Sequence, residues 1–180
     1  MNMPPGQKIV VIGPESTGKS TLCEMLAAHF QTQWVPEYAR EYLVEHGMNY
    51  TFSDLLTIAK GQLAQEEKIA AEMEEGLLFI DTDMYVMKVW CEFVFNQCHQ
   101  WIIDQIALRR YDFYLLCNTD LPWAPDPLRE YPDLESREEL FHIYKDLLQN
   151  QSTPWVEITG GASGRLPQAI QAIDKWSGTL

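Results

Sequence analysis

An eight-residue motif near the N-terminus constrains the fold of this chain more than any other feature. The motif has the pattern G-x-x-x-x-G-K-S and consists of Gly13, Pro14, Glu15, Ser16, Thr17, Gly18, Lys19 and Ser20. A β-branched apolar run over 8–12 precedes it, and apolar residues at helical spacing over 22–30 follow it. Glycines allow the loop between such a strand and helix to point consecutive backbone N–H groups at phosphate oxygens. The sequence therefore predicts an ATP site, a P-loop, at residues 13–20 and the adjoining Thr21.

The end of the motif predicts a magnesium site as well as a phosphate site. Lys19 is expected to bridge the β- and γ-phosphates, and the Ser20 hydroxyl to ligate Mg²⁺. A further metal residue is expected at Asp81, which directly follows an apolar run over 77–80. An acidic residue at the end of a buried strand beside a P-loop is placed to hold Mg²⁺. The predicted cofactors are therefore ATP and Mg²⁺.

Strand-like and helix-like patterns alternate along the chain. Strands are predicted over 8–12, 33–35, 77–80, 113–117 and 155–158, and helices after the P-loop and over 53–75, 84–95, 134–148 and 167–176. This alternation predicts an α/β fold with a parallel five-stranded sheet and helices on both faces. Four of the ten prolines fall within residues 122–132, which predicts an irregular segment after the fourth strand. We expect a single domain over 1–180, with a lid at about 120–137.

Several acidic and basic residues have two interpretations at this stage. Glu37 follows the second predicted strand, where a kinase carboxylate accepts or orients the proton of the acceptor hydroxyl, and Arg40 lies one helical turn later. The same pair is also typical of a helix start with a surface ion pair. Asp83 is expected either to contact substrate or to cap the helix over 84–95.

Two arginines in and after the proline-rich segment suit a lid over the phosphates. Arg129 and Arg137 carry guanidinium groups, which match phosphate oxygens, and a mobile lid excludes water from phosphoryl transfer. The alternative is a proline-stiffened surface loop with solvated arginines.

Charge and composition limit the classes of partner that the protein can bind and indicate where in the cell it is located. The chain has 13 Lys and Arg against 26 Asp and Glu, a formal net charge of −13, which opposes binding to nucleic acids and anionic membranes. No apolar stretch approaches the roughly 18 residues of a membrane span. The N-terminal apolar run is too short for a signal peptide, so we expect a cytoplasmic protein with four reduced cysteines.

Two classes of P-loop protein are disfavoured by their missing motifs. A switch GTPase would carry D-x-x-G and N-K-x-D, whereas this chain has Asp-Thr-Asp-Met at 81–84 and Asn-Thr-Asp-Leu at 118–121. An AAA-type motor would carry Asp-Glu after the third strand and a helical lid domain, and the sequence predicts neither. These observations favour a small-molecule kinase.

Four segments together resemble the NadR-type ribosylnicotinamide kinase domain family. They are G-P-E-S-T-G-K-S-T-L from 13, V-P-E-Y-A-R-E-Y from 35, F-I-D-T-D from 79 and D-L-P-W-x-x-D-x-x-R from 120. The resemblance implies ATP-dependent phosphorylation of the 5′-hydroxyl of nicotinamide riboside to nicotinamide mononucleotide, with catalytic residues Lys19, Glu37 and Asp81. It also implies which residues line the acceptor side, namely Glu37, Tyr38, Arg40, Asp81 and Asp83. The lid residues that it implies are Trp123, Arg129 and Arg137.

One departure from the family pattern leaves the identity of the acceptor substrate open. Pro36 stands where members often carry an aromatic residue that stacks on the pyridinium ring, so stacking would pass to Tyr38, Tyr85 or Trp123. The alternatives are a kinase for another nucleoside or small metabolite, and a regulatory ATP-binding module without rapid turnover. Motifs of an adenylyltransferase or DNA-binding domain are missing, so we expect a stand-alone kinase with a small-molecule nucleoside as partner. The sequence does not fix the oligomeric state.

Overall fold

A five-stranded parallel sheet organises the chain, whose computed structural model describes residues 6–73 and 75–178. The strand order is β2-β3-β1-β4-β5, and every adjacent pair is parallel. The strands are β1 (Gln7–Ile12), β2 (Trp34–Val35), β3 (Leu77–Asp81), β4 (Phe113–Cys117) and β5 (Trp155–Ile158). The helices are α1 (Lys19–Phe30), α2 (Tyr38–His46), α3 (Phe52–Ala71), α4 (Met84–Phe95), α5 (Gln100–Leu108), α6 (Leu134–Gln149) and α7 (Ala162–Ser177). The predicted fold class is confirmed.

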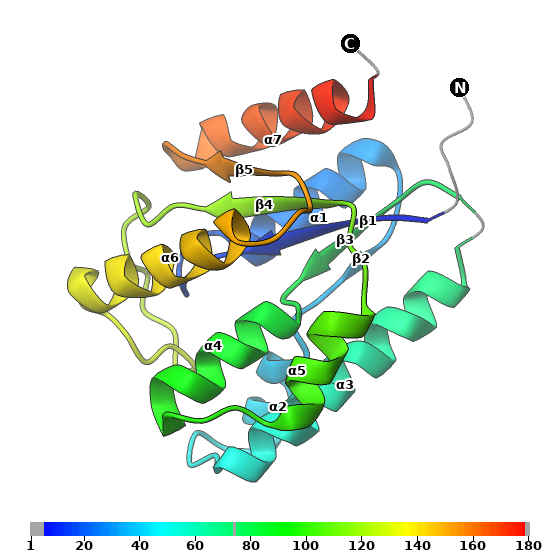
Figure 1. The fold of residues 1–180 in the computed structure, drawn as a ribbon. Helices are drawn as coiled ribbons and strands as arrows, with labels where there is room; N and C mark the ends of the chain where they lie inside the picture. The colour runs from blue at the N-terminus through cyan, green and yellow to red at the C-terminus, as the bar shows by residue number, and fades with distance from the viewer. Residues whose placement is uncertain (1–5, 74, 179–180) are drawn as a thin grey trace.

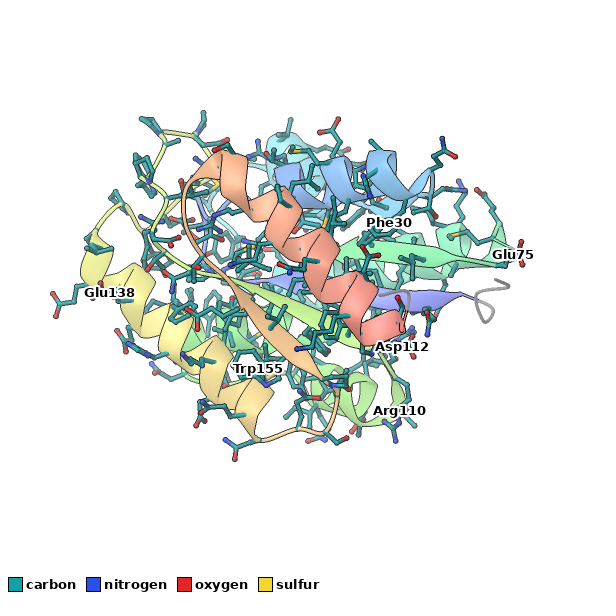
Figure 2. All side chains as sticks on the ribbon, turned by 90° about the horizontal axis from the view of Figure 1, so that it is seen from above. Phe30, Glu75, Arg110, Asp112, Glu138 and Trp155 are labelled. Carbon is teal, nitrogen blue, oxygen red and sulfur yellow. The ribbon has the colours of Figure 1, made fainter. Side chains whose placement is uncertain are left out.

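Helices cover both faces of the sheet because its central strands are apolar on both sides. Ile9 and Val11 of β1 pack with α1 and α7, whereas Val10 and Ile12 pack with α4 and α6. All four side chains are fully buried, as a central parallel strand requires. In Figure 1, α1 and α7 lie above the sheet, and α2, α3, α4 and α5 gather below it. The view from above in Figure 2 shows α7 passing over the strands, with α1 beside it.

The predicted helix boundaries are wrong in two places, for identifiable local reasons. The helix expected over 53–75 begins at Phe52, because Thr51 caps it: the Thr51 side chain accepts from Asp54 N and Thr51 N donates to Asp54 Oδ2. It ends at Ala71 rather than beside Gly76. The helix expected from Pro167 begins five residues earlier, at Ala162, and contains that proline.

The segment between β4 and α6 is irregular, as the proline content predicts. Residues 118–133 form neither helix nor strand, and the lid (residues 120–137) runs from this segment into the first turn of α6.

The four cysteines are free, and three of them are buried. Among the residues that the structure describes, no helix has the length and hydropathy needed to cross a membrane. The expected domain limits and the start of the N-terminal segment lie outside the described residues.

Candidate nucleotide site and acceptor cavity

The loop between β1 and α1 has the backbone shape of an anion-binding site. Gly13, Ser16 and Gly18 have positive φ angles of 145°, 57° and 78°, which turn successive N–H groups toward one point. A Cβ atom on Gly13 would lie 2.6 Å from the carbonyl oxygen of Cys117, so glycine is required where β4 approaches the loop. The N-terminus of α1 adds its partial positive charge at the same point.

Lys19, Ser20 and Asp81 lie together at the carboxyl ends of β1 and β3. Lys19 Nζ donates to the carbonyl oxygen of Pro14 at 2.9 Å, and Ser20 Oγ donates to Asp81 Oδ2 at 2.5 Å. Asp81 is fully buried, and its other oxygen, Oδ1, has no hydrogen-bond partner. Burial raises the pKa of Asp81, while the nearby Lys19 ammonium opposes that rise. An unpartnered carboxylate oxygen beside a hydroxyl is a donor set that suits Mg²⁺.

Glu37 lies across from this group, at the N-terminus of α2. Burial and then the negative charge of Asp81 raise the pKa of Glu37 to about 7, and Lys19 lowers it. A carboxyl group that titrates near neutrality is suited to accepting a proton from a reacting hydroxyl.

Gln62 joins the strand ends that carry these two carboxylates, and sequence reasoning missed it. Its Nε2 donates to the carbonyl oxygens of Asp81 at 3.2 Å and Pro36 at 3.4 Å, and its Oε1 accepts from Tyr38 N at 2.8 Å. Gln62 is buried in α3, and a glutamine in mid-helix carries no local signal of such a role.

A cavity of about 200 Å³ extends from the P-loop between α2, α4, α6 and the lid. The whole motif from Gly13 to Thr21 lines it, together with Glu37, Arg40 and Arg129. Apart from Glu130, its remaining wall is mainly apolar and includes the rings of Trp90, Phe93, Tyr131 and Tyr144. The cavity therefore joins a phosphate-binding loop to an aromatic compartment.

The three aromatic residues expected to replace the missing stacking residue do not line this cavity. Tyr38 packs against Gly61, where an added Cβ atom would lie 2.1 Å from the tyrosine ring. Tyr85 lines a separate, more polar cavity beside α5. Trp123 lies in the lid, and its indole N–H is buried without a hydrogen-bond partner. The cavity rings come from α4, α6 and the lid, which the sequence does not connect.

Asp83 caps α4, which confirms one of its two interpretations. Oδ1 accepts from Tyr85 N at 3.0 Å and Val86 N at 3.2 Å, and Oδ2 accepts from the Tyr114 hydroxyl at 2.8 Å. Burial raises the pKa of Asp83 to about 6. Both oxygens are engaged within the protein, and Asp83 does not line the cavity beside the P-loop. A contact with substrate stays a prediction.

The two predicted lid arginines lie in different environments. Arg129 lines the cavity, whereas Arg137 is 3% exposed and is not among the lining residues. The Arg137 guanidinium donates to the carbonyl oxygens of Ser16 at 3.3 Å and Leu121 at 3.1 Å. Arg137 thus joins the lid to the P-loop, and burial lowers its pKa.

Arg165 of α7 supports the P-loop and has no counterpart in the sequence predictions. It is 3% exposed and donates to the carbonyl oxygens of Thr17 at 3.0 Å, Asn118 at 3.0 Å and Gly160 at 2.9 Å. It also forms an ion pair with Asp120. The arginine therefore fixes the P-loop to the end of β4 and to the loop after β5.

The strand order, the loop after β1 and the acidic end of β3 define a P-loop protein with a kinase-like fold. A thymidylate kinase from Ehrlichia chaffeensis has the same fold, with a TM-score of 0.67 at 13% identity over 94% of this chain and 99% of that one. A family described as an AAA domain, AAA_28, matches residues 8–165, and the chain belongs to this family. β3 ends at Asp81 and is followed by Thr82, rather than by the glutamate of the Asp-Glu pair expected of an AAA-type motor.

Several relatives and solved structures similar to this chain are NadR proteins. The trifunctional NAD biosynthesis/regulator protein NadR of Salmonella typhimurium is 27% identical over 175 residues, which cover 94% of this chain and 42% of the relative. NadR crystal structures with NR, and with NAD and AMP-PNP, have TM-scores of 0.76 and 0.75 at 26% identity. They cover 97% of this chain, and this chain spans about half of theirs, 52% and 50%. The predicted resemblance to NadR-type proteins is confirmed.

Proposed function

We propose that this chain is an ATP-dependent kinase that phosphorylates the 5′-hydroxyl of nicotinamide riboside, giving nicotinamide mononucleotide. The observation that carries the proposal is the cavity that leads from the P-loop past Glu37 to a compartment lined by aromatic rings. Similarity to NadR, which has been crystallised with NR and with an ATP analogue, supports the choice of substrates. The net charge of −13 suits a cationic pyridinium nucleoside.

The phosphate half of the site binds and neutralises the transferred group. Backbone N–H groups of the P-loop hold the β- and γ-phosphates, and Lys19 and Arg129 offset their charge. Ser20 and Asp81 would hold Mg²⁺, which supplies further neutralisation when bound. In-line transfer depends on this positioning and charge neutralisation more than on covalent chemistry.

The acceptor half orients the nucleoside and takes up its proton. Glu37 accepts the proton of the 5′-hydroxyl as that oxygen attacks the γ-phosphate. Trp90, Phe93 and Tyr131 offer ring faces and edges to a pyridinium, for which aromatic contact is favourable. Arg40 and Tyr38 stay predicted contributors to this side, and the assignment of 120–137 as the lid belongs to the same proposal. The cytoplasmic location stays a prediction.

A nucleoside panel tests the proposal directly. ATP consumption would be measured with Mg²⁺ and nicotinamide riboside, with each of the four deoxynucleosides, and without an acceptor. We expect stimulation by nicotinamide riboside alone, with the mononucleotide formed. Stimulation by another nucleoside would retain the chemistry and replace the substrate. ATP binding without stimulation by any acceptor would indicate a regulatory module instead.

A further inference from the structure

The carboxylate of Glu15, at the second variable position of the P-loop, binds the lid. Glu15 Oε2 accepts from Glu130 N at 3.0 Å, and Oε1 accepts from Tyr131 N. The next residue also binds the lid backbone, at a different position: Ser16 Oγ accepts from Ala124 N at 2.8 Å. Two consecutive P-loop side chains therefore hold the lid backbone at two places.

A carboxylate is poorly suited to bind phosphate oxygens directly, because both groups are anionic and both only accept hydrogen bonds. Glu15 was expected among the ATP-binding residues, and its position in the loop is consistent with a backbone contact. Its side chain needs a different partner, and the two lid N–H groups provide one. Hydrogen bonds to a charged acceptor are stronger than those between neutral groups.

Other contacts hold the lid near its two ends, where the Arg137 guanidinium donates to the Ser16 and Leu121 carbonyl oxygens and Asp120 pairs with Arg165. Between these ends no residue of 121–136 is fully buried, and Leu128 and Tyr131 pack only in part against the core. The ion pair between Arg40 and Asp126 is 2.6 Å long, but the arginine side chain is 53% exposed. Such exposed pairs contribute little. The Tyr50 hydroxyl donates to Glu130 Oε2, and that bond holds a side chain rather than the backbone.

The lid segment held by Glu15 carries residues of the acceptor compartment. Residues 128–131 line the cavity, and the Tyr131 ring packs against Phe93 of α4 with centroids 5.2 Å apart and planes at 82°. Fixing the backbone at 130 and 131 therefore fixes the position of this ring. A hydrogen bond made by the P-loop thus shapes the wall that faces the nucleoside.

We propose that Glu15 is a positioning residue that docks the lid on the P-loop and so sets the acceptor wall of the cavity. The kinetic part of this inference rests on the proposed function, and the docking part does not. Loss of the carboxylate should loosen residues 130–131, raise KM for the nucleoside and leave the affinity for the nucleotide unchanged.

The first experiment needs no catalysis. Backbone amide hydrogen exchange would be compared in the wild type, Glu15→Ala, Glu15→Gln and Glu24→Gln, which removes the same charge from an exposed position on α1. We expect the amides of Glu130 and Tyr131 to exchange at least about tenfold faster in Glu15→Ala. Glu15→Gln, with one acceptor left, should fall between, and Glu24→Gln should match the wild type. Unchanged exchange at both amides in Glu15→Ala overturns the docking role.

The second experiment separates the lid from the nucleotide. KM for nicotinamide riboside and the affinity for AMP-PNP would be measured for the same four proteins. We expect Glu15→Ala to raise the nucleoside KM about tenfold and to change AMP-PNP affinity less than about twofold. An equal loss of AMP-PNP affinity would make Glu15 a nucleotide-binding residue and overturn the inference. If the wild type phosphorylates no nucleoside, the proposed function fails and the exchange experiment still decides the docking role.

Discussion

The P-loop and the lid both line one cavity, but they are held in place by different means. The P-loop is fixed from behind by buried contacts, with Gly13 against the Cys117 carbonyl and Arg165 donating to the Thr17 carbonyl. The lid backbone between its two ends is not buried and donates hydrogen bonds to the side chains of Glu15 and Ser16. The comparison teaches that the phosphate half is built to be rigid, whereas the acceptor half can adjust around a nucleoside.

The largest expected effect on turnover comes from removing charged groups in the phosphate half of the site. We expect Lys19→Ala and Asp81→Ala each to abolish turnover, because phosphoryl transfer depends on charge neutralisation at the transferred group. Single-turnover phosphorylation would measure the loss, and thermal unfolding would show whether each variant is folded. Substantial turnover in either folded variant would contradict the assignment of the phosphate half.

A pair of arginine substitutions measures how differently the two walls are held. Arg165→Met leaves the Thr17 and Asn118 carbonyl oxygens without their donor and should cost about 2–4 kcal/mol of unfolding free energy. Arg40→Met breaks an exposed ion pair with the lid and should cost at most about 1 kcal/mol. Urea unfolding of both variants tests this. Equal losses would mean that the two walls are held equally firmly.

A substitution of Glu37 tests the acceptor side of the site, and its expected effect on rate is smaller than that of Lys19→Ala or Asp81→Ala. Glu37→Gln should lower kcat at least about 100-fold while leaving ATP affinity unchanged, because the side chain is expected to handle only the acceptor proton. Burial raises the pKa of Glu37 to about 7, so the ionised, proton-accepting form increases as pH rises through that value.

The pH profile distinguishes this role from a structural one. Wild-type kcat should rise between about pH 6 and pH 8 and then level off, and the variant should lack that rise. Matched variants with an exposed glutamate changed, such as Glu45→Gln on α2, should keep the wild-type profile. Wild-type turnover in Glu37→Gln would remove Glu37 from the mechanism.

The same contrast explains how much the sequence could predict. The P-loop is defined by backbone shape within eight consecutive residues, so Gly13 and Lys19 could be placed without a structure. Asp81 could be placed because a buried parallel strand ends there. The parallel sheet with helices on both faces followed from the alternation of strands and helices.

The acceptor compartment could not be predicted, because it is built from side chains on separate elements. Trp90, Tyr131 and Tyr144 come together only when α4, the lid and α6 have packed. Gln62 and Arg165 are missed for the same reason, since their partners lie far along the chain or on the backbone of other loops. No spacing rule connects these residues before the chain has folded.

Thr82 lies between the phosphate half of the site and α4, and a small effect on stability is predicted for its substitution. It lies between Asp81, which faces the P-loop, and Asp83, which caps α4, and its φ angle is +80°. That conformation is unfavourable for a β-branched residue, and the Thr82 hydroxyl is buried without a hydrogen-bond partner. The strained residue thus separates Asp81, which accepts from Ser20, from Asp83, which caps α4.

Glycine and alanine at position 82 separate strain from the loss of the hydroxyl. Both variants remove the unpartnered oxygen, but only glycine accepts a positive φ angle without strain, so Thr82→Gly should be more stable than Thr82→Ala by about 1 kcal/mol. That order reverses the one expected at ordinary positions, where glycine is the less stable choice. Urea unfolding measures the difference, and a more stable alanine variant would show that the backbone at 82 is not strained. If the strain also holds the two carboxylates apart, Thr82→Gly should turn over more slowly than the wild type even though it is more stable than Thr82→Ala, because Asp81 is then less firmly aimed at Ser20.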